Sequence, residues 1–402
     1  MFPAAFIPVP GGPSGQERAF GTTPSARFGS AAGVELLVGG VAHRGWRSMK
    51  ATISLDAPAA KFTLELADRW VDDPALAPRV VKPGAACQLR LDGDVVVDGW
   101  IDAVEAAYDG RDHVLTVVAR DRVGDLVDCA AVLDGPHEWA DLRLDEIARR
   151  LAEPYGVTVV AEVDPGAAFP RFAIQPGETA WEALDRAAKS RGILLAGTGT
   201  GTLRLTRAAE AKPGAGPIEF GVNVRRAFGV FDHSGRHSVV CVRGQAEGGP
   251  ADAGGAEGRQ RDDAIARYRP RVLVAETAGG AGAFTDRAAW EVRGAAGRSV
   301  RIGYVVAGWR GASGALWRTM TRVPVRDRFL GIEADLLVSA VVYSLTLSDG
   351  SVTEVEVTLP DAYDIQPAPQ KPGRAAAPGA ERGLFDVTSG APVRVPVPGG
   401  GA

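Results

Sequence analysis

Residues Val95 to Arg120 read VVVDGWIDAVEAAYDGRDHVLTVVAR, and this stretch predicts one long β-hairpin. Its first strand runs without a proline to Ala107, and the segment Tyr108–Asp112 contains the Asp-Gly pair that is typical of hairpin turns. At ~3.3 Å per residue the first strand would be roughly 43 Å long, against a usual strand of about 5–6 residues. Gly99 before Trp100 predicts a β-bulge. A strand of this length favours a barrel or an extended sheet over a compact enzyme core.

The composition predicts a globular chain of several domains. Its 402 residues allow two to four domains, and 46% hydrophobic with 23% charged residues is enough to bury real cores. The formal net charge of −4 and the isoelectric point near 5.9 argue against a protein that wraps nucleic acid by bulk positive charge. The 51 glycines and 27 prolines indicate many turns and some unstructured segments.

The cysteines and the N-terminus bear on the compartment. Cys87, Cys129 and Cys241 are too few and too widely spaced for a disulfide framework or a zinc knuckle. We expect reduced, buried thiols, which fit assembly in a cytosol. The N-terminal MFPAAFIPVPGGPSG lacks a basic region and is interrupted by prolines, so it does not read as a signal peptide. Without a run of about 18 apolar residues, no stable membrane span is expected.

The N-terminal third is rich in predicted strands. Residues 1–33 contain much Pro, Gly, Ser and Ala with scattered Phe, which predicts an extended arm, with plain disorder as the alternative. Residues 34–135 hold about six strands and no convincing helix, which favours a small antiparallel barrel or sandwich. The strands before the hairpin are expected at Val34–Val41, Trp46–Leu55, Lys61–Leu66 and Cys87–Leu91.

Residues 136–210 predict a small α+β domain. Apolar residues recur at helical spacing between Leu144 and Leu151, with Asp141 as the candidate cap. Thr179 followed by Glu182 is a capping box that starts a second helix. A helix followed by a glycine and a strand thus occurs twice, at Leu144–Val160 and at Trp181–Leu195. The strands are expected at Val157–Val163, Ile193–Ala196 and Leu203–Thr206.

Residues 211–360 return to a β pattern. The segment 244–263 is almost devoid of large apolar residues and predicts a loop or linker, and a helix is expected near 285–294 with Thr285 as its cap. Residues 361–402 predict a tail rich in Pro, Gly and Ala. A second long hairpin is expected from Leu336–Leu347 and Ser351–Leu359, joined by Ser348-Asp349-Gly350.

Asp121, Asp125 and Asp128 are the first candidate for a functional cluster. Their spacing lacks the D-x-D-x-D-G pattern of a calcium loop. A solvated, helix-like turn with Leu126 and Val127 facing inward explains them better.

Two further patterns imitate known sites. The glycines of 197-GTGTG-201 imitate a phosphate loop, but they lead into the strand LRLTR rather than a helix, so a hairpin turn is expected. Glu178, Glu182 and Asp185 imitate paired catalytic carboxylates. Glu182 is used by the capping box, and the other two fit a solvated helix face.

His233, His237 and Cys241 are spaced by four residues, which on one helix could hold a metal ion. Here a predicted turn and strand separate them, so they would not share a face. The sequence therefore predicts no catalytic residue, no cofactor site and no metal site.

Several segments in order along residues 34–365 resemble the baseplate hub proteins of Mu-like contractile-tail bacteriophages. The module around Trp181 is also similar to its counterpart in the spike proteins of type VI secretion. The segments that carry the resemblance are KFTLEL, DGWIDAVEAAYDG, ARDRVGDLVDCAAV, LDEIARRLAEPYGVTV, FPRFAIQPGETAWEALDRAAKSRGILL, LRLTRA, RYRPRVLV and ADLLVSAVVYSLTLSDG.

The resemblance implies a mainly β protein with an α+β insert: two tail-tube-like antiparallel β-barrel domains, at 34–135 and 211–360, and the small α+β domain between them. It implies a structural protein, a homotrimer whose six similar barrels match a six-fold tail tube to a three-fold spike. The ring would line the channel for genome ejection. Together with the net charge, Asp98, Asp102 and Glu105 predict an acidic lumen.

The implied partners are the central spike protein and the tail tube or distal tube protein, with the tape-measure protein and baseplate wedge proteins as further candidates. DNA would only pass through the lumen. The protein would be assembled in the host bacterial cytoplasm and reside in the virion, in the tail baseplate.

Two other functions are alternatives. A tail-associated cell-wall hydrolase would need a carboxylate pair or a Cys/His set in a cleft. A peptidoglycan- or carbohydrate-binding tail module could use the repeated helix–strand units of residues 141–206, and it is compatible with a hub.

Overall fold

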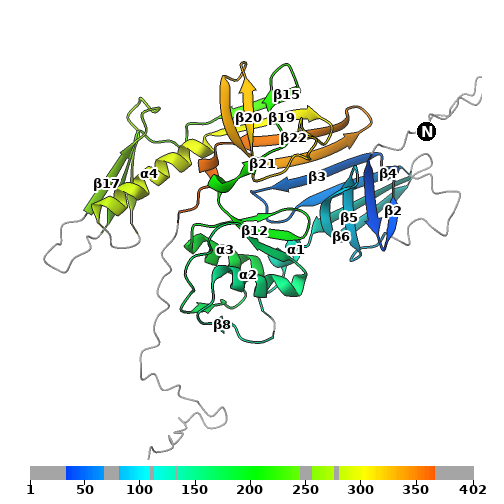
Figure 1. Cartoon of the computed structure of the whole chain (residues 1–402), viewed down its shortest axis with the longest axis horizontal. Coiled ribbons are helices and arrows are strands. Elements are labelled where there is room, and N and C mark those ends of the chain that lie inside the picture. Colours follow the sequence, from blue (N-terminus) through cyan, green and yellow to red (C-terminus); the bar gives the residue numbers. More distant parts are fainter. Residues whose placement is uncertain are drawn as a thin grey trace, which may run out of the picture.

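A computed structural model describes residues 33–67, 81–108, 113–132, 134–244, 256–275 and 280–366. The predicted arm up to residue 32 and the predicted tail from residue 367 lie outside the described residues, as does the predicted hairpin turn at 109–112. Figure 1 shows a large curved sheet, an α+β unit beneath it and a separate lobe around helix α4. No helix within these described ranges is long and apolar enough to cross a membrane.

The strands before the long hairpin form because apolar residues alternate along them. In the first strand every second side chain is buried, since successive strand side chains point to opposite faces. The predicted strand Val34–Val41 is split in two at Gly39 and Gly40, which both have positive φ. The strands are β1 (Val34–Val38), β2 (Val41–His43), β3 (Ser48–Ser54), β4 (Lys61–Ala67) and β5 (Ala86–Leu91).

The long hairpin forms as the sequence predicts. Strand β6 (Asp94–Tyr108) has 15 residues and β7 (His113–Asp121) has nine. Strand β6 carries one bulge at Val96, which the pairing with β5 skips, and one at Asp102, which the pairing with β7 skips; the prediction of a bulge at Gly99 was wrong. Gly99 meets a different need: a Cβ there would lie 2.0 Å from the carbonyl oxygen of Arg120, so a larger residue would push β7 away.

The second β region contains the other predicted hairpin. It pairs a strand of 15 residues with one of nine, and the long strand again carries a bulge, at Ser339. The strands of this region are β13 (Lys212–Pro213), β14 (Ile218–Glu219), β15 (Val224–Phe231), β19 (Val300–Ala307), β20 (Thr321–Asp327), β21 (Ile332–Thr346) and β22 (Gly350–Thr358).

The two β regions are not two separate barrels. Strand β3 pairs antiparallel with β21, from Ala340 opposite Ser54 to Leu345 opposite Met49. This seam joins all the strands named so far into one 14-stranded sheet, in which no closed barrel is found among the described residues. Buried residues of both regions form one continuous hydrophobic core on one face of this sheet. The barrel expectation is therefore replaced by an open, curved sheet.

The α+β unit follows β7 and has its own core. Its two larger helices pack against the sheet β11-β12-β9, which has one parallel and one antiparallel pairing. Helix α1 begins directly after β7 and buries Leu126, whereas Val127 is only partly buried. The elements are α1 (Val123–Asp128), β8 (Glu138–Trp139), α2 (Leu144–Ala152), β9 (Thr158–Ala161), β10 (Phe172–Ala173), α3 (Ala180–Ser190), β11 (Leu194–Gly197) and β12 (Thr202–Thr206).

The helix starts show one correct and one wrong prediction. Thr179 and Glu182 form the predicted capping box: the Glu182 N–H donates to Thr179 Oγ1 at 3.2 Å, and the Thr179 N–H donates to Glu182 Oε2 at 2.9 Å. Asp141 does not cap α2. Arg143 is the N-cap residue, and its backbone N–H donates to the Glu146 carboxylate at 2.7 Å.

The segment between β15 and β19 forms a lobe of its own, which the sequence did not reveal. Within the predicted loop 244–263, residues 245–255 lie outside the described residues, but Ala256–Arg261 is a strand. The predicted helix at 285–294 is much longer and starts after Gly280, so Thr285 is not its cap. The lobe consists of β16 (Val239–Gly244), β17 (Ala256–Arg261), β18 (Pro270–Val274) and α4 (Ala281–Arg298).

Candidate functional site: a central cleft and an exposed sheet edge

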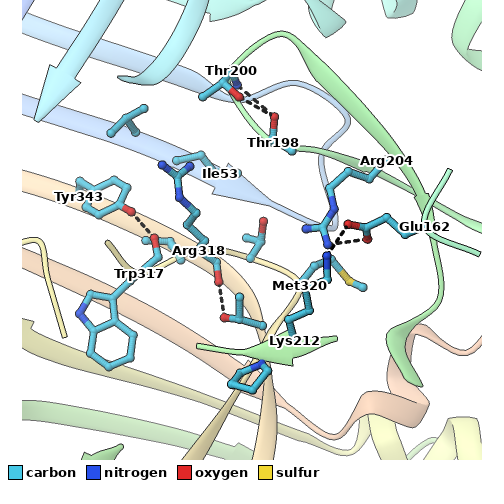
Figure 2. A pocket seen from close by; sticks show the side chains of 15 residues that line it. Ile53, Glu162, Thr198, Thr200, Arg204, Lys212, Trp317, Arg318, Met320 and Tyr343 are labelled. Carbon is cyan, nitrogen blue, oxygen red and sulfur yellow. Dashed lines mark hydrogen bonds and ion pairs between the residues drawn. The ribbon is translucent and has the colours of Figure 1, made fainter. Parts of the chain in front are cut away.

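A cleft of about 480 Å³ lies where the α+β unit meets the large sheet. Figure 2 shows side chains from both parts pointing into it. The hairpin turn 198–200 and strands near Glu162 and Arg204 form one wall, and the segment 317–321 with Tyr343 forms another. The cleft therefore exists only because stretches distant in sequence are folded together.

The α+β side of the cleft carries a charged group centred on Glu162. Arg204 lies 2.5 Å and Lys212 3.3 Å from its carboxylate oxygens. Burial alone would raise the pKa of Glu162, but the hydrogen bonds and charge of Arg204 outweigh it, so the net pKa is lowered. The carboxylate is thus held ionised between two cations.

The sheet side of the cleft presents Arg318 and Tyr343. Arg318 is exposed and forms no ion pair with any described residue. The Tyr343 hydroxyl donates to the backbone carbonyl of Trp317, and burial raises the pKa of this phenol. Tyr343 therefore stays protonated and fixes the turn that carries Arg318.

The lining suits binding rather than catalysis. Three cationic side chains face one carboxylate, and that carboxylate is already neutralised by two of them. Thr198 and Thr200 add hydroxyls that hydrogen-bond to each other at 2.9 Å. An acid–base pair needs groups free to exchange a proton, which Glu162 is not.

The carboxylates near α3 occupy structural positions. Glu178 forms a paired contact with Arg186, with both oxygens at 2.8 Å from the guanidinium nitrogens, and Glu182 caps the helix. Asp185 pairs with Lys189 one turn later, at 2.6 Å. The three carboxylates do not converge on a cleft. The Glu178 side chain is only 9% exposed, so the prediction that it lies on a solvated face was wrong, whereas Asp185 is partly exposed.

The aspartates around α1 separate into different environments. Asp128 contacts Arg120 at 2.7 Å, and Asp102 of β6 contacts the same guanidinium at 2.7 Å. Asp121 is buried, and this burial raises its pKa to about 7. The group is therefore no calcium loop. Asp102 is paired with Arg120, and Asp98 lies 3.4 Å from Arg122. Of the three acids proposed for the lumen, only Glu105 forms no ion pair with a described residue.

The remaining candidate residues lie in a turn, a loop and a strand. Thr198 to Gly201 is the hairpin turn between β11 and β12. His233 lies in the loop before β16 and contacts Arg236, whereas Cys241 is buried in the middle of β16. No group of three potential metal ligands is found in the described ranges.

The three cysteines are free thiols. Cys87 and Cys241 are buried, and Cys129 is only partly buried, which corrects the expectation of three buried thiols. Burial raises the pKa of Cys87 to about 12. Cys87 is thus an unreactive core residue.

The strongest unexplained surface surrounds β15, the terminal strand of the large sheet. Nearly all of β15 is exposed, including Phe228, Val230 and Phe231 at about half their maximal area. Phe220 and Phe329 stack next to this strand, with ring centroids 6.4 Å apart. Concentrated apolar exposure of this kind marks an interaction surface. Sequence reasoning missed it, although three aromatic residues within Phe220–Phe231 were visible.

Three protein-family models match successive parts of the chain. Residues 33–121 match the Mu phage baseplate assembly protein GpP-like N-terminal model, and residues 123–207 match the second domain of gp44-like baseplate hub proteins. Residues 281–366 match the fourth domain of Mu phage baseplate assembly protein GpP. The matched ranges follow the first β region, the α+β unit, and α4 with the final strands.

Known proteins resemble the chain over most of its length. Baseplate hub protein gp44 of Escherichia phage Mu is 32% identical over 337 residues, covering 81% of this chain and 87% of that protein. The crystal structure of the 43 kDa tail protein of prophage MuSo2 from Shewanella oneidensis is 32% identical with a TM-score of 0.73. That match covers 83% of this chain and 99% of the other.

A more distant likeness shows the fold alone. The c3393 protein of E. coli, a type VI secretion component, is 12% identical with a TM-score of 0.51, covering 83% of this chain and 79% of that one. The phage relatives are similar enough in sequence, and over enough of the chain, to show its family as well as its fold. The chain belongs to the baseplate hub proteins of Mu-like phage tails, and it is a structural component of the virion rather than an enzyme.

Proposed function

We propose that this hub acts as a homotrimeric ring that adapts a three-fold central spike to a six-fold tail tube and lines the channel for genome ejection. The observation that carries the proposal is the presence of two matching long hairpins, β6–β7 and β21–β22, in one chain. Three chains would then present six similar β surfaces, and closed rotational symmetry is the usual arrangement of homo-oligomers.

The open sheet supports a ring. Its terminal strand β15 has unpaired backbone groups and exposed aromatic side chains, a combination that natural proteins usually cover. Head-to-tail contact between chains would cover this edge in every subunit of a closed ring. The cost of exposing such an edge in a monomer supports assembly as its purpose.

The partners proposed are the spike protein on one side of the ring and the tube or distal tube protein on the other. Tape-measure and baseplate wedge proteins are further candidates, and DNA only passes through the lumen. Assembly takes place in the host cytoplasm, where the free thiols would stay reduced.

The test is co-expression of the hub with the spike and tube proteins, followed by mass measurement of the purified complexes. We expect a species with three hub chains, alone and in complex with spike. A hub that remains monomeric and binds neither protein would contradict the proposal.

A second role, binding of cell-wall glycan, is favoured by one observation. The cleft combines threonine hydroxyls with the unpaired Arg318 at the edge of the α+β unit. A pull-down with isolated peptidoglycan, comparing the wild type with Arg318→Ala, tests it. Equal retention of both proteins would show that the cleft does not bind glycan.

A further inference from the structure

The two β regions of this chain follow one strand plan. In chain order, β3, β4, β5, β6 and β7 correspond to β15, β19, β20, β21 and β22, because the pairings match. β3–β4–β7–β6 repeats as β15–β19–β22–β21, and β5 pairs with the first half of β6 as β20 pairs with the first half of β21. All of these pairings are antiparallel. The lobe with α4 is an insertion between the first two strands of the second copy.

The bulges fix the correspondence residue by residue. Asp102 is skipped in the pairing of β6 with β7, and Ser339 is skipped in the pairing of β21 with β22. Aligning these two residues places Val104 on Val341. From these two residues, the cross-strand partners can be followed strand by strand through each β region. They end on β3 in the first region and on β15 in the second, and they place Phe231 on Ile53.

Within the chain, the edge of β21 beyond its bulge is filled. Residues Ala340 to Leu345 pair with β3, and Val341 lies directly opposite Ile53. Both side chains are buried, at 1% and 7% exposure. The backbone N–H of Leu55 completes this seam with a 2.8 Å hydrogen bond to Ser339.

The corresponding edge of β6 is open. The pairing with β5 ends at Trp100, and two further hydrogen bonds follow at Ile101: its N–H donates to the Ala85 carbonyl, and its carbonyl accepts from the Gly84 N–H. From Ala103 to Tyr108 this edge has no strand partner among the described residues. The strand that corresponds to β3 is β15, and β15 is the exposed terminal strand. One chain therefore contains both strands of a second seam, β15 and the open part of β6, but does not pair them with each other.

We propose that β15 of one hub chain pairs antiparallel with residues 103–108 of β6 in the next chain, repeating the β3–β21 seam between subunits. This proposal rests on the trimeric ring proposed above and assigns its contact. The ring would alternate three seams within chains with three seams between chains. The partner is a second copy of this chain, because the only seam of this geometry in the described structure joins these same strand types.

The proposed register places compatible side chains opposite each other. Phe231 would face Val104, and both would point to the side of the core, as Ile53 and Val341 do. Gly229 would face Ala106 on the same side. On the other side, Val230 would face Glu105 and Phe228 would face Ala107, so no like charges meet.

Cysteine cross-linking tests the register. Opposite residues of an antiparallel pair have Cα atoms about 4.5–5.5 Å apart, within reach of a disulfide. Chains with Val104→Cys mixed with chains carrying Phe231→Cys should give a covalent dimer on mild oxidation, and neither variant alone should. Replacing the second variant by Arg226→Cys, five positions away, should abolish the product. Ile53→Cys with Val341→Cys is the control within one chain.

A charge in the seam tests its contribution to assembly. Phe231→Asp should raise the protein concentration of half-assembly by at least about tenfold, because the carboxylate would be buried without a partner. Val274→Asp, at an exposed apolar position of β18, should leave assembly unchanged. Molar mass by light scattering over a dilution series measures both, and circular dichroism checks that the variants fold.

The outcomes separate the seam from the ring. A trimer that persists with Phe231→Asp and yields no cross-link overturns the seam and leaves the ring standing. Loss of the trimer without the specific cross-link overturns the pairing with β6. A wild-type chain that is monomeric at every concentration overturns the ring and the seam together.

Discussion

Leu55 donates its backbone N–H to the carbonyl oxygen of Ser339 across 284 positions of sequence, at 2.8 Å. This bond ends the seam in which β3 continues the sheet from β21. Since the core is continuous across the seam, the first and second β regions share buried side chains. They are therefore expected to unfold together.

Calorimetry of the purified protein tests this coupling. Ile53→Ala removes a buried side chain from the seam and should lower stability by about 2–5 kcal/mol while both β regions still melt in one transition. Val41→Ala, at an exposed position, should change stability by no more than about 0.5 kcal/mol. Separate transitions for the two β regions would show that the seam does not couple them.

The capping box of α3 predicts a second effect. Thr179→Ala should cost about 1 kcal/mol in the free energy of unfolding, because the first turn loses an acceptor for the Glu182 N–H. Glu182→Gln keeps a side chain that can accept from the Thr179 N–H, so it serves as the matched control. Urea denaturation measures both; an equal loss in the two variants would argue against the box.

Gly258 predicts how tightly α4 packs on its lobe. A Cβ at this position would lie 2.1 Å from the backbone nitrogen of Thr285, so Gly258→Ala should push α4 away from β17. Gly282→Ala is the control, because nothing lies within 4 Å of its Cβ and alanine favours the helix by up to about 1 kcal/mol. Hydrogen exchange in α4 should rise in the first variant only.

The pH dependence of stability has a component from Asp121. Burial raises its pKa to about 7, whereas the pKa of an aspartate in an unfolded chain is about 3.9. Between these values the folded protein keeps a proton that the unfolded chain has lost, so stability falls as pH rises through this window. Asp121→Asn should flatten the fall, which can reach a few kcal/mol at about 1.4 kcal/mol per pKa unit.

Denaturation at several pH values between 4 and 8 measures this component. Asp263→Asn, at a side chain that is 93% exposed, is the matched control and should keep the wild-type slope. A slope that is unchanged in Asp121→Asn would mean that the group does not titrate differently on folding.

Glu162 contributes a change of stability with pH that has the opposite sign to that of Asp121 and occurs at acidic pH. Its pKa is lowered in the folded state, so its contribution is present above the unfolded value and is lost as pH falls through and below about 4.5. Glu162→Gln should cost about 1–3 kcal/mol at pH 7, because Arg204 and Lys212 lose their partner, and should matter less below pH 4. Glu219→Gln, from the more exposed pair with Arg326, should cost less.

Local patterns predicted the local structure. Alternating apolar residues gave the strands, the turn residues gave both long hairpins, and Thr179 with Glu182 gave the start of α3. The seam was not predictable in this way, because Ile53 and Val341 pair across the chain and nothing in either strand specifies the other. Two separate barrels were therefore the natural interpretation of two β-rich regions, whereas the described strands of both regions belong to one open sheet.

The lobe was missed for a related reason. Ala256–Arg261 reads AEGRQR, which has almost no apolar side chains, and it is a strand because it pairs with β16 and packs against α4. Gly294 made α4 look short, yet the helix continues to Arg298, and a Cβ at Gly297 would lie 2.3 Å from the nitrogen of Ala362. The cleft likewise depends on Glu162 and Tyr343, which only the folded chain brings together.

The lobe leaves the large sheet after Phe231 and returns at Val300, and these two residues are direct cross-strand partners. In the first β region the same two strands are linked by only the six residues between Ser54 and Lys61. The sheet therefore does not require the lobe for its continuity. A foreign domain whose ends lie close together could be grafted between Phe231 and Val300 as cargo, which makes this junction a natural attachment point for engineered tail particles.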